Sequence, residues 1–370
     1  MIQTRGAIMR SAPGKWEIVD IEFDEPRQGE LQLKMVASGL CHSDDHIATG
    51  DSVLERYPLI GGHEGAGIVE KVGPNTPGWQ VGDQVVMACM PACGRCRWCA
   101  SGQQNLCDLG GIVMTGCRPD GTFRARVDGI DAGQMCCIST FTERTVIDVT
   151  SAVKVDPDVP LTRACMVGCG VSTGWGSAVY SGDIRPGQTV IVMGVGGVGI
   201  HAVQGAVHAG ASNVVAVDPV AFKTDVARKL GATDTFGDIA SAAEFARSVT
   251  NGQGADVVII TTGVLQNEHI SQALEATRKG GTLVITSVGN SERALIEVPA
   301  WQVTIYQRRI QGALFGASSP SRDVPWLLDM YRRGQLRLDE VVTTTYSLDQ
   351  INEGYADMHA GKNMRGVLVY

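Results

Sequence analysis

Between residues 189 and 289 the chain alternates short apolar stretches, typical of buried strands, with amphipathic stretches, typical of helices. The strand-like stretches are TVIVMG, NVVAVD, ADVVIITTG and GTLVITSVG. Such alternation implies a parallel sheet with helices on both of its faces. The sequence therefore predicts a doubly wound α/β domain over residues 171–314.

A glycine motif, GVGGVG, joins the first strand of this region to its first helix. Gly194 allows the tight turn, Gly196 lets the backbone approach a pyrophosphate, and Gly199 lets helix and strand pack closely. The free N–H groups at the start of the helix suit phosphate. The motif predicts a Rossmann dinucleotide site, with Gly197 and Val198 as further contacts.

Asp218 ends the next strand, 19 residues after Gly199. A carboxylate there accepts hydrogen bonds from the adenosine ribose and repels a 2′-phosphate, which favours NAD over NADP. Lys223 is a second candidate for the ribose, although a lysine on a helix is commonly only solvated. A glycine-rich turn with a capping aspartate is the alternative that needs no nucleotide.

The remainder of the chain has a different pattern. Before residue 171, strand-like runs such as LQLKMV, GIVEKV and DQVVMA alternate with Gly and Pro turns, as in a β-rich core with irregular loops. From about residue 315 the chain is expected to return to this first domain and to end in the strand RGVLVY. We expect one domain of residues 1–170 with 315–370, and a second of residues 171–314.

Four cysteines lie within fifteen residues in a lobe of about residues 89–110, at the spacing CxxCxxCx7C: Cys93, Cys96, Cys99 and Cys107. Eleven cysteines in a large chain with an odd count do not indicate a disulfide framework. The spacing lets four thiolates converge on one zinc ion, which such a closed set holds for structure rather than catalysis. An iron–sulfur cluster is the competing interpretation, although no proline follows the fourth cysteine.

Three separated stretches carry other metal-binding side chains. They are GLCHSDDH with Cys41, GGHEGAG with His63 and Glu64, and CMVGCGVSTG with Cys169. Two thiolates and one imidazole with an open fourth position make a catalytic zinc set. Nothing in the sequence by itself shows that these residues meet.

These stretches, the cysteine lobe and GVGGVG occur in an order and spacing that resemble the zinc-dependent medium-chain alcohol dehydrogenases over essentially the whole chain. The resemblance implies a GroES-like catalytic domain beside the Rossmann domain. It also implies two zinc ions per chain, NAD(H), and oxidation of a small-molecule alcohol to an aldehyde or ketone.

The resemblance assigns roles residue by residue. Cys41, His63 and Cys169 match the catalytic zinc ligands, and the four lobe cysteines match the structural zinc ligands. Glu64 matches the acidic residue beside the metal, and Asp44 the carboxylate that orients the histidine ligand. Ser43 and His46 match a relay that carries the alcohol proton toward solvent.

Further positions match cofactor contacts or depart from them. Thr173 matches a residue on the nicotinamide side, and Arg365 a position near the cofactor phosphates. His42 stands where many relatives have an arginine, so the pyrophosphate loses a bidentate charge partner. Cys89 replaces a bulky pocket residue, which suggests a roomy substrate site.

The stretches VLERYPLIGGHEGAGIVEKVG and CGRCRWCASGQQNLCDLGG look most like the nicotinoprotein alcohol dehydrogenases assayed with N,N-dimethyl-4-nitrosoaniline. Those enzymes retain NAD and reoxidise it with an external electron acceptor. A thiol-adduct formaldehyde dehydrogenase is the first alternative, with Arg118, Arg124 and Arg126 as candidate anchors for the thiol cofactor. A non-enzymatic nicotinamide nucleotide-binding protein is the second.

The remaining expectations come from composition and the N-terminus. A formal net charge of −8 offers no basic face for nucleic acid or anionic lipid. We expect a cytoplasmic protein, because no signal peptide or long apolar stretch is present. A homo-oligomer, dimer or tetramer, is what the resemblance implies, with the Rossmann edge segment RRIQGALFG as a candidate interface.

Overall fold

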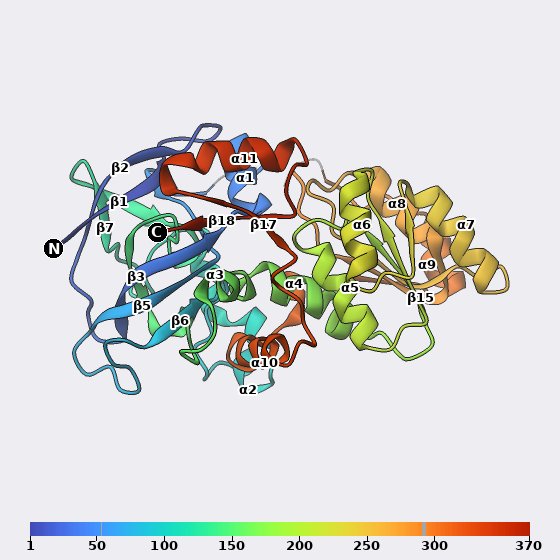
Figure 1. Ribbon diagram of the computed structural model, residues 1–370, viewed down its shortest axis with the longest axis horizontal. Coiled ribbons are helices and arrows are strands. Elements are labelled where there is room, and N and C mark those ends of the chain that lie inside the picture. The colour runs from blue at the N-terminus through green and yellow to red at the C-terminus, as the bar shows by residue number, and fades with distance from the viewer. Residues whose placement is uncertain (53, 291–293) are drawn as a thin grey trace. The chain divides into compact units, whose positions relative to one another are not determined.

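The structure is a computed structural model that describes residues 1–52, 54–290 and 294–370. The chain forms two compact units, Met1–Cys169 with Ser319–Tyr370, and Gly170–Ser318 (Figure 1). The expected boundaries at residues 170/171 and 314/315 differ from these by one and four residues. In the described ranges, no helix is both long and apolar enough to cross a membrane.

The first unit contains a small closed barrel and a larger sheet. The barrel strands, in order, are β1 (Ile2–Met9), β2 (Glu17–Phe23), β7 (Ala125–Val127), β8 (Ile130–Gln134) and β4 (Leu59–Ile60). The sheet has β10 (Ala152–Val155), β6 (Gln84–Met87), β5 (Gly65–Val72), β3 (Glu30–Gly39), β18 (Arg365–Val369) and β17 (Val342–Tyr346), with β9 (Arg144–Asp148) also on β3. The helices are α1 (His42–Thr49), α2 (Arg97–Ala100), α3 (Leu161–Ala164), α10 (Pro320–Arg332) and α11 (Ile351–His359).

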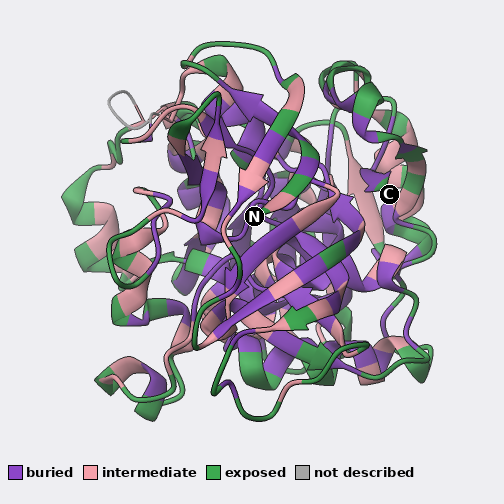
Figure 2. Cartoon of the chain, turned by 90° about the vertical axis from the view of Figure 1, so that its left-hand side faces the viewer, coloured by how far each residue is buried: buried purple, intermediate pink, exposed green. Residues whose placement is uncertain are grey.

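The short strands of this unit are stabilised by the side chains that they bury. The barrel core is filled by fully buried side chains such as Ile8, Ile21 and Phe23. Figure 2, which faces this unit, shows buried strands inside and exposed residues on loops and outer helix faces. The C-terminal strand β18 pairs antiparallel with β3, so the chain end completes the sheet that its first part began.

The second unit is a six-stranded parallel sheet in the order β13 (Asp234–Phe236), β12 (Asn213–Val217), β11 (Thr189–Met193), β14 (Ala255–Ile260), β15 (Thr277–Ile285) and β16 (Arg309–Gly312). This is the 3-2-1-4-5-6 order of a Rossmann sheet. The helices are α4 (Gly170–Gly176), α5 (Gly199–His208), α6 (Ala221–Lys229), α7 (Ile239–Val249), α8 (Asn267–Ala276) and α9 (Ala300–Tyr306).

The central strands β11, β12 and β14 are apolar along most of their length, because helices cover both faces of the sheet. All five residues of β11 are buried, and α7 and α8 contribute Ala242, Ala246 and Leu274 to the core on one face. The expected fold class, a GroES-like β-rich domain with a doubly wound Rossmann domain, is confirmed. The edge strand β16, within the expected oligomer segment, is mostly exposed.

Candidate functional site

Four metal-binding side chains converge in the first unit, although they come from distant parts of the chain. Donor atoms of Cys41, His63, Glu64 and Cys169 all lie within 4.8 Å of one another. Cys41 caps the start of α1, His63 and Glu64 immediately precede β5, and Cys169 ends a short 3₁₀ turn (Cys165–Gly168). The structure thus brings together the three ligands predicted for a catalytic zinc, with Glu64 beside them.

His63 is held by a carboxylate that is completely buried. Asp44 accepts a hydrogen bond from the Gly62 N–H at 2.9 Å, and its second oxygen lies 2.9 Å from His63 Nδ1. Burial lowers the pKa of His63, but the nearby charges of Asp44 and Cys41 outweigh it and raise the pKa well above its usual range. Because Asp44 makes an ion-pair contact at Nδ1, Nε2 is left for a ligand, and no hydrogen-bond partner among the described residues meets Nε2.

The thiols of Cys41 and Cys169 shift each other's pKa in opposite directions. A hydrogen bond from Cys169 is the largest cause that holds the pKa of Cys41 well below its usual range, and the same contact raises that of Cys169. Two sulfurs and an imidazole nitrogen, with room for one ion, suit a soft divalent metal such as zinc. The residues present therefore fit the metal that the sequence predicts.

Glu64 belongs to a buried ion pair. Arg365 of β18 reaches its carboxylate, and both side chains are at most 5% exposed. Burial raises the pKa of Glu64 to about 7, against the opposing charge of Arg365. Gly39 makes room for the pair, because a Cβ there would lie 2.8 Å from Glu64 Cδ. Arg365 was predicted near cofactor phosphates, and that contact stays a prediction; nothing in the sequence signalled its pairing with Glu64.

The predicted relay residues lie along α1. Ser43 is exposed, and its Oγ lies 3.8 Å from Cys41 Sγ. His46 is buried, with Nδ1 3.4 Å from Asp51 Oδ2, and its ring centroid lies 6.4 Å from that of His42. The helix therefore carries Ser43 beside the metal donors and His46 one turn further on, while the relay itself stays a prediction.

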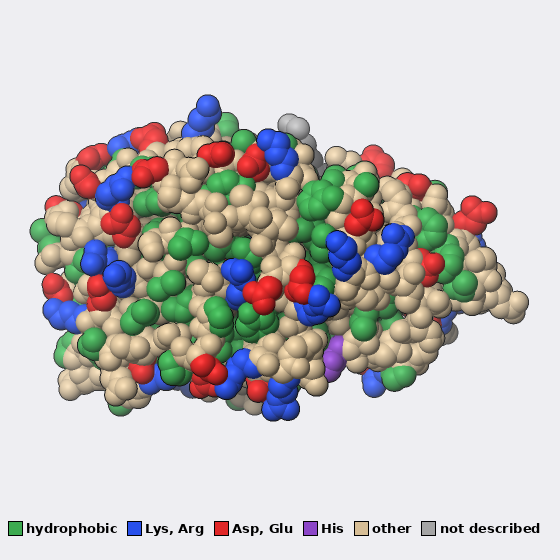
Figure 3. All heavy atoms as spheres, in the orientation of Figure 1, with side chains coloured by type: hydrophobic (Ala, Val, Ile, Leu, Met, Phe, Trp, Pro, Cys, Tyr) green, Lys and Arg blue, Asp and Glu red, His purple; other side chains and the backbone are tan. Residues whose placement is uncertain are grey.

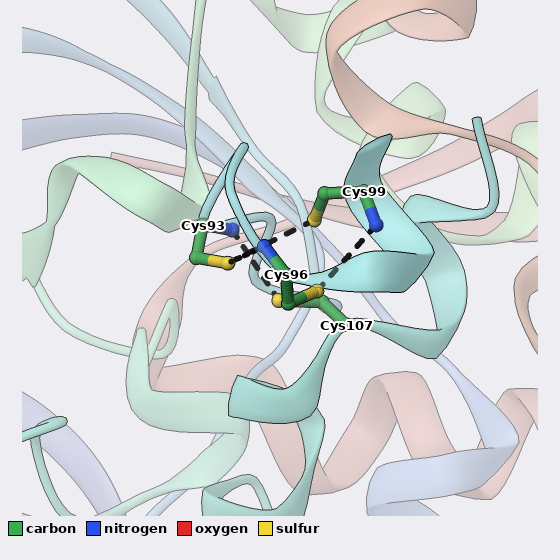
Figure 4. Close-up of side chains that lie close together, drawn as sticks. All are labelled: Cys93, Cys96, Cys99 and Cys107. Carbon is green, nitrogen blue, oxygen red and sulfur yellow. Dashed lines mark hydrogen bonds between the residues drawn. The ribbon is translucent and has the colours of Figure 1, made fainter. Parts of the chain in front are cut away.

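The four lobe cysteines point toward one another around α2 (Figure 4). Their sulfurs all lie within 4.8 Å of one another. Backbone N–H groups of Cys99 and Asp108 lower the pKa of Cys96 to about 6, whereas burial raises that of Cys99 to about 12. A tetrahedral ion with metal–sulfur bonds of about 2.3 Å has sulfur–sulfur edges of about 3.8 Å. This compact arrangement fits one ion better than an iron–sulfur cluster, whose inorganic atoms hold the thiolates further apart.

The lobe is also fastened to the start of α10. Ser319 Oγ donates to the Gly102 carbonyl oxygen at 2.6 Å, and Gln104 Nε2 donates to Ser321 Oγ at 2.6 Å. These bonds connect residues that are 217 positions apart in the chain.

The glycine loop of the second unit has the geometry that its sequence predicts. Gly194 has φ +88°, a conformation that favours glycine. A Cβ at Gly199, the first residue of α5, would lie 1.9 Å from the Gly194 carbonyl oxygen. At Gly196 the nearest atom to an added Cβ is Lys223 Nζ, at 4.0 Å, so the backbone there is open. Gly197 and Val198 complete the turn.

Polar side chains surround this loop. Asp218 is buried at the end of β12, and its carboxylate accepts from the backbone N–H groups of Val195 at 3.1 Å and Val220 at 3.0 Å. The ammonium of Lys223 lies over Gly196. An acidic residue and a cation at a glycine turn fit the ribose and phosphates of a dinucleotide. Thr173, on α4, is partly exposed.

The arginines considered as anchors for a thiol cofactor are already engaged. Arg118 and Arg124 are each 2% exposed. Arg118 donates to the Cys137 carbonyl oxygen at 2.5 Å, and Arg124 pairs with Glu30 at 2.9 Å. Arg126, on the barrel strand β7, is partly exposed and forms ion pairs at 2.7 and 3.4 Å. Two of the three candidates are thus structural groups inside the first unit.

Comparison with known proteins identifies the family of the chain. The family described as alcohol dehydrogenase GroES-like domain matches residues 27–157, and that described as zinc-binding dehydrogenase matches residues 197–333. A protein named NDMA-dependent alcohol dehydrogenase, from Amycolatopsis methanolica, is 47% identical over 369 residues, which cover 100% of this chain and 99% of the relative.

Solved structures of related proteins match the fold of the whole chain. An alcohol dehydrogenase zinc-binding domain protein from Burkholderia ambifaria matches with a TM-score of 0.91 and 30% identity, covering 100% of this chain and 99% of the other. Benzyl alcohol dehydrogenase from Acinetobacter calcoaceticus matches with a TM-score of 0.90, 26% identity and the same coverage.

Fold and matches together define an oxidoreductase of the zinc-binding dehydrogenase class. The chain belongs to the zinc-dependent medium-chain alcohol dehydrogenase family, and the predicted enzyme class is thereby confirmed.

Replacing Cys96 with Ser should remove one metal ion per chain and lower the melting temperature by several degrees, because a structural metal site contributes folding free energy. Metal content and thermal unfolding measure both effects. Cys117→Ser is the matched control, since Cys117 is a buried thiol outside both donor clusters. An unchanged melting temperature for Cys96→Ser would argue against a structural metal.

Replacing Gly199 with Ala should lower the midpoint of urea unfolding, because the new Cβ collides with the Gly194 carbonyl; overpacking of this kind costs about 1–3 kcal/mol. Gly196→Ala adds the same methyl group where only Lys223 Nζ is near, so its unfolding midpoint should stay close to that of the wild type. Equal midpoints for the two variants would contradict the packing described for Gly199.

Proposed function

We propose that this alcohol dehydrogenase oxidises an alcohol reversibly to an aldehyde or ketone by hydride transfer to NAD, with two zinc ions per chain. The buried donor set of Cys41, His63 and Cys169 carries the proposal. Two sulfurs and one imidazole leave a coordination position open for substrate, as a catalytic zinc requires, whereas the four-cysteine lobe is closed. Bound at the first set, zinc would act as a Lewis acid toward an alcohol or carbonyl oxygen.

The protein groups around the donors have distinct tasks in this proposal. Asp44 fixes the His63 ring so that Nε2 faces the ion site. Arg365 neutralises Glu64, so a carboxylate beside two thiols does not leave excess buried negative charge. Both are positioning residues, because they act through the donors.

Ser43 and His46 handle the proton. The Ser43 hydroxyl, beside Cys41, takes the proton that the alcohol loses, and His46 is the base that receives it further along α1. The loop from Gly194 to Gly199 and Asp218 would hold NAD, which when bound would supply the hydride acceptor. Lys223, Thr173, His42 and Arg365 are further proposed contacts of the nucleotide.

Retention of NAD is the finer part of the proposal. The relative with 47% identity is named for dependence on NDMA, an artificial electron acceptor. We infer that NAD remains bound through the cycle and that a small external acceptor reoxidises it. The thiol-adduct formaldehyde alternative is less well supported, because Arg118 and Arg124 are buried in ion pairs and hydrogen bonds. A homo-oligomeric state and a cytoplasmic location stay predictions.

Replacing Cys169 with Ala should lower kcat/KM for a simple alcohol by more than the roughly 10–100-fold loss typical of residues that only support a metal ligand. Cys165→Ala is the matched control: Cys165 is a buried thiol four residues earlier, and it belongs to neither donor cluster. Steady-state kinetics with circular dichroism separates loss of activity from loss of fold. Undiminished turnover by the Cys169 variant would remove the catalytic assignment.

Denaturing the purified protein without added cofactor should release close to one NAD(H) per chain, if the nucleotide is retained. Chromatographic quantification of the released nucleotide against protein concentration gives the ratio. A ratio near zero would show that NAD exchanges as a free cosubstrate, and would leave the metal assignments untouched.

A further inference from the structure

A thiol that is not among the predicted metal ligands lies beside one that is. Cys89 follows β6, and its backbone N–H donates to the carbonyl oxygen of Gly168 at 3.1 Å. After Cys41, the neighbouring Cys89 side chain is the next largest cause that raises the pKa of Cys169. Cys89 is nevertheless outside the donor group of Cys41, His63, Glu64 and Cys169.

The backbone geometry suits a covalent bond between these two thiols. A disulfide needs Cα atoms about 4.4–6.8 Å apart. The backbone N–H of Cys89 bonds the carbonyl oxygen of Gly168, and Cys169 is the residue directly after that acceptor. The main chains of the two cysteines are therefore held side by side.

The two thiols differ in what holds them. A metal ion at the predicted site would bind the sulfurs of Cys41 and Cys169, whereas Cys89, outside this donor group, would keep a free thiol. Cys89 is buried with 8% exposure, and Cys169 is partly exposed. An oxidant that reaches the site therefore meets one free sulfur adjacent to one ligand sulfur.

We propose that Cys89 and Cys169 form a reversible redox pair, in which oxidation by a hydroperoxide produces a disulfide and removes a metal ligand. The Cys89 sulfur attacks the peroxide, the O–O bond breaks, and a sulfenic acid forms with release of one water or alcohol. The Cys169 sulfur then attacks the Cys89 sulfur; the S–S bond forms, the S–O bond breaks, and the oxygen leaves as water. Two thiols lose two electrons and two protons in total.

The consequence for the site follows from ligand chemistry. A disulfide sulfur is not a thiolate, so the donor set falls from three ligands to two and the ion dissociates. Reduction by a dithiol regenerates both thiols. This inference rests on the proposed role of Cys169 as a zinc ligand, and it adds Cys89 as a modification site.

The test compares wild type, Cys89→Ser and Cys136→Ser. Cys136 is the matched control, because it is a second thiol near the site, where burial raises its pKa and the charges of His63 and Cys89 act on it. Each protein is analysed for zinc, treated with hydrogen peroxide, and followed with a chromogenic zinc chelator. Peptide mass spectrometry then maps the disulfides.

We expect the wild type and Cys136→Ser to release one of two zinc ions, with a Cys89–Cys169 disulfide, and to recover after dithiothreitol and zinc. Cys89→Ser should release zinc at least about tenfold more slowly. Equal release by Cys89→Ser, or a mapped Cys41–Cys169 disulfide in the wild type, would overturn the pair. Fewer than two zinc ions before oxidation would contradict the proposed function instead, while the mapped disulfide would still decide the pair.

Discussion

The buried carboxylate of Asp44 is the constraint on which the first unit's site depends. A buried charged group is costly unless it is compensated, and here one oxygen accepts from the Gly62 N–H while the other faces the His63 ring at ion-pair distance. These two contacts place α1, which carries Asp44, against the turn before β5. One electrostatic requirement therefore fixes both the orientation of an imidazole ligand and the packing of the helix that bears Cys41, Ser43 and His46.

A second buried carboxylate of the site, that of Glu64, is also compensated by an opposite charge. Glu64 would add a further buried negative charge beside two thiols, and Arg365 from the C-terminal strand neutralises it. The strand reaches that position because β18 pairs with β3, the strand that leads into Cys41. Away from the site, charges of both signs are interspersed on the surface that Figure 3 shows. The site therefore depends on the last residues of the chain as much as on its first.

Sequence patterns predict those features of the structure that depend on interactions between residues close together in the chain. Alternating strands and helices around β11 and β12, the turn at Gly194 and the spacing of Cys93 to Cys107 are local, and the fold shows each of them. The meeting of Cys41 with Cys169, 128 residues apart, could be expected only through resemblance to a family. No sequence pattern predicts the Glu64–Arg365 ion pair or the backbone bond from Cys89 to Gly168, because each joins segments whose proximity depends on the packing of the whole unit.

Hydrogen bonds between the cysteine lobe and the start of α10 connect the lobe to residues far beyond its own fifteen. They hold Ser319 and Ser321 at the point where the polypeptide re-enters the first unit after building the second. An ion bound by the four cysteines would therefore also stabilise contacts between segments 217 residues apart. The lobe thus anchors the point at which the chain returns to the first unit after forming the second, so metal binding there would support the connection between distant segments as well as the local fold.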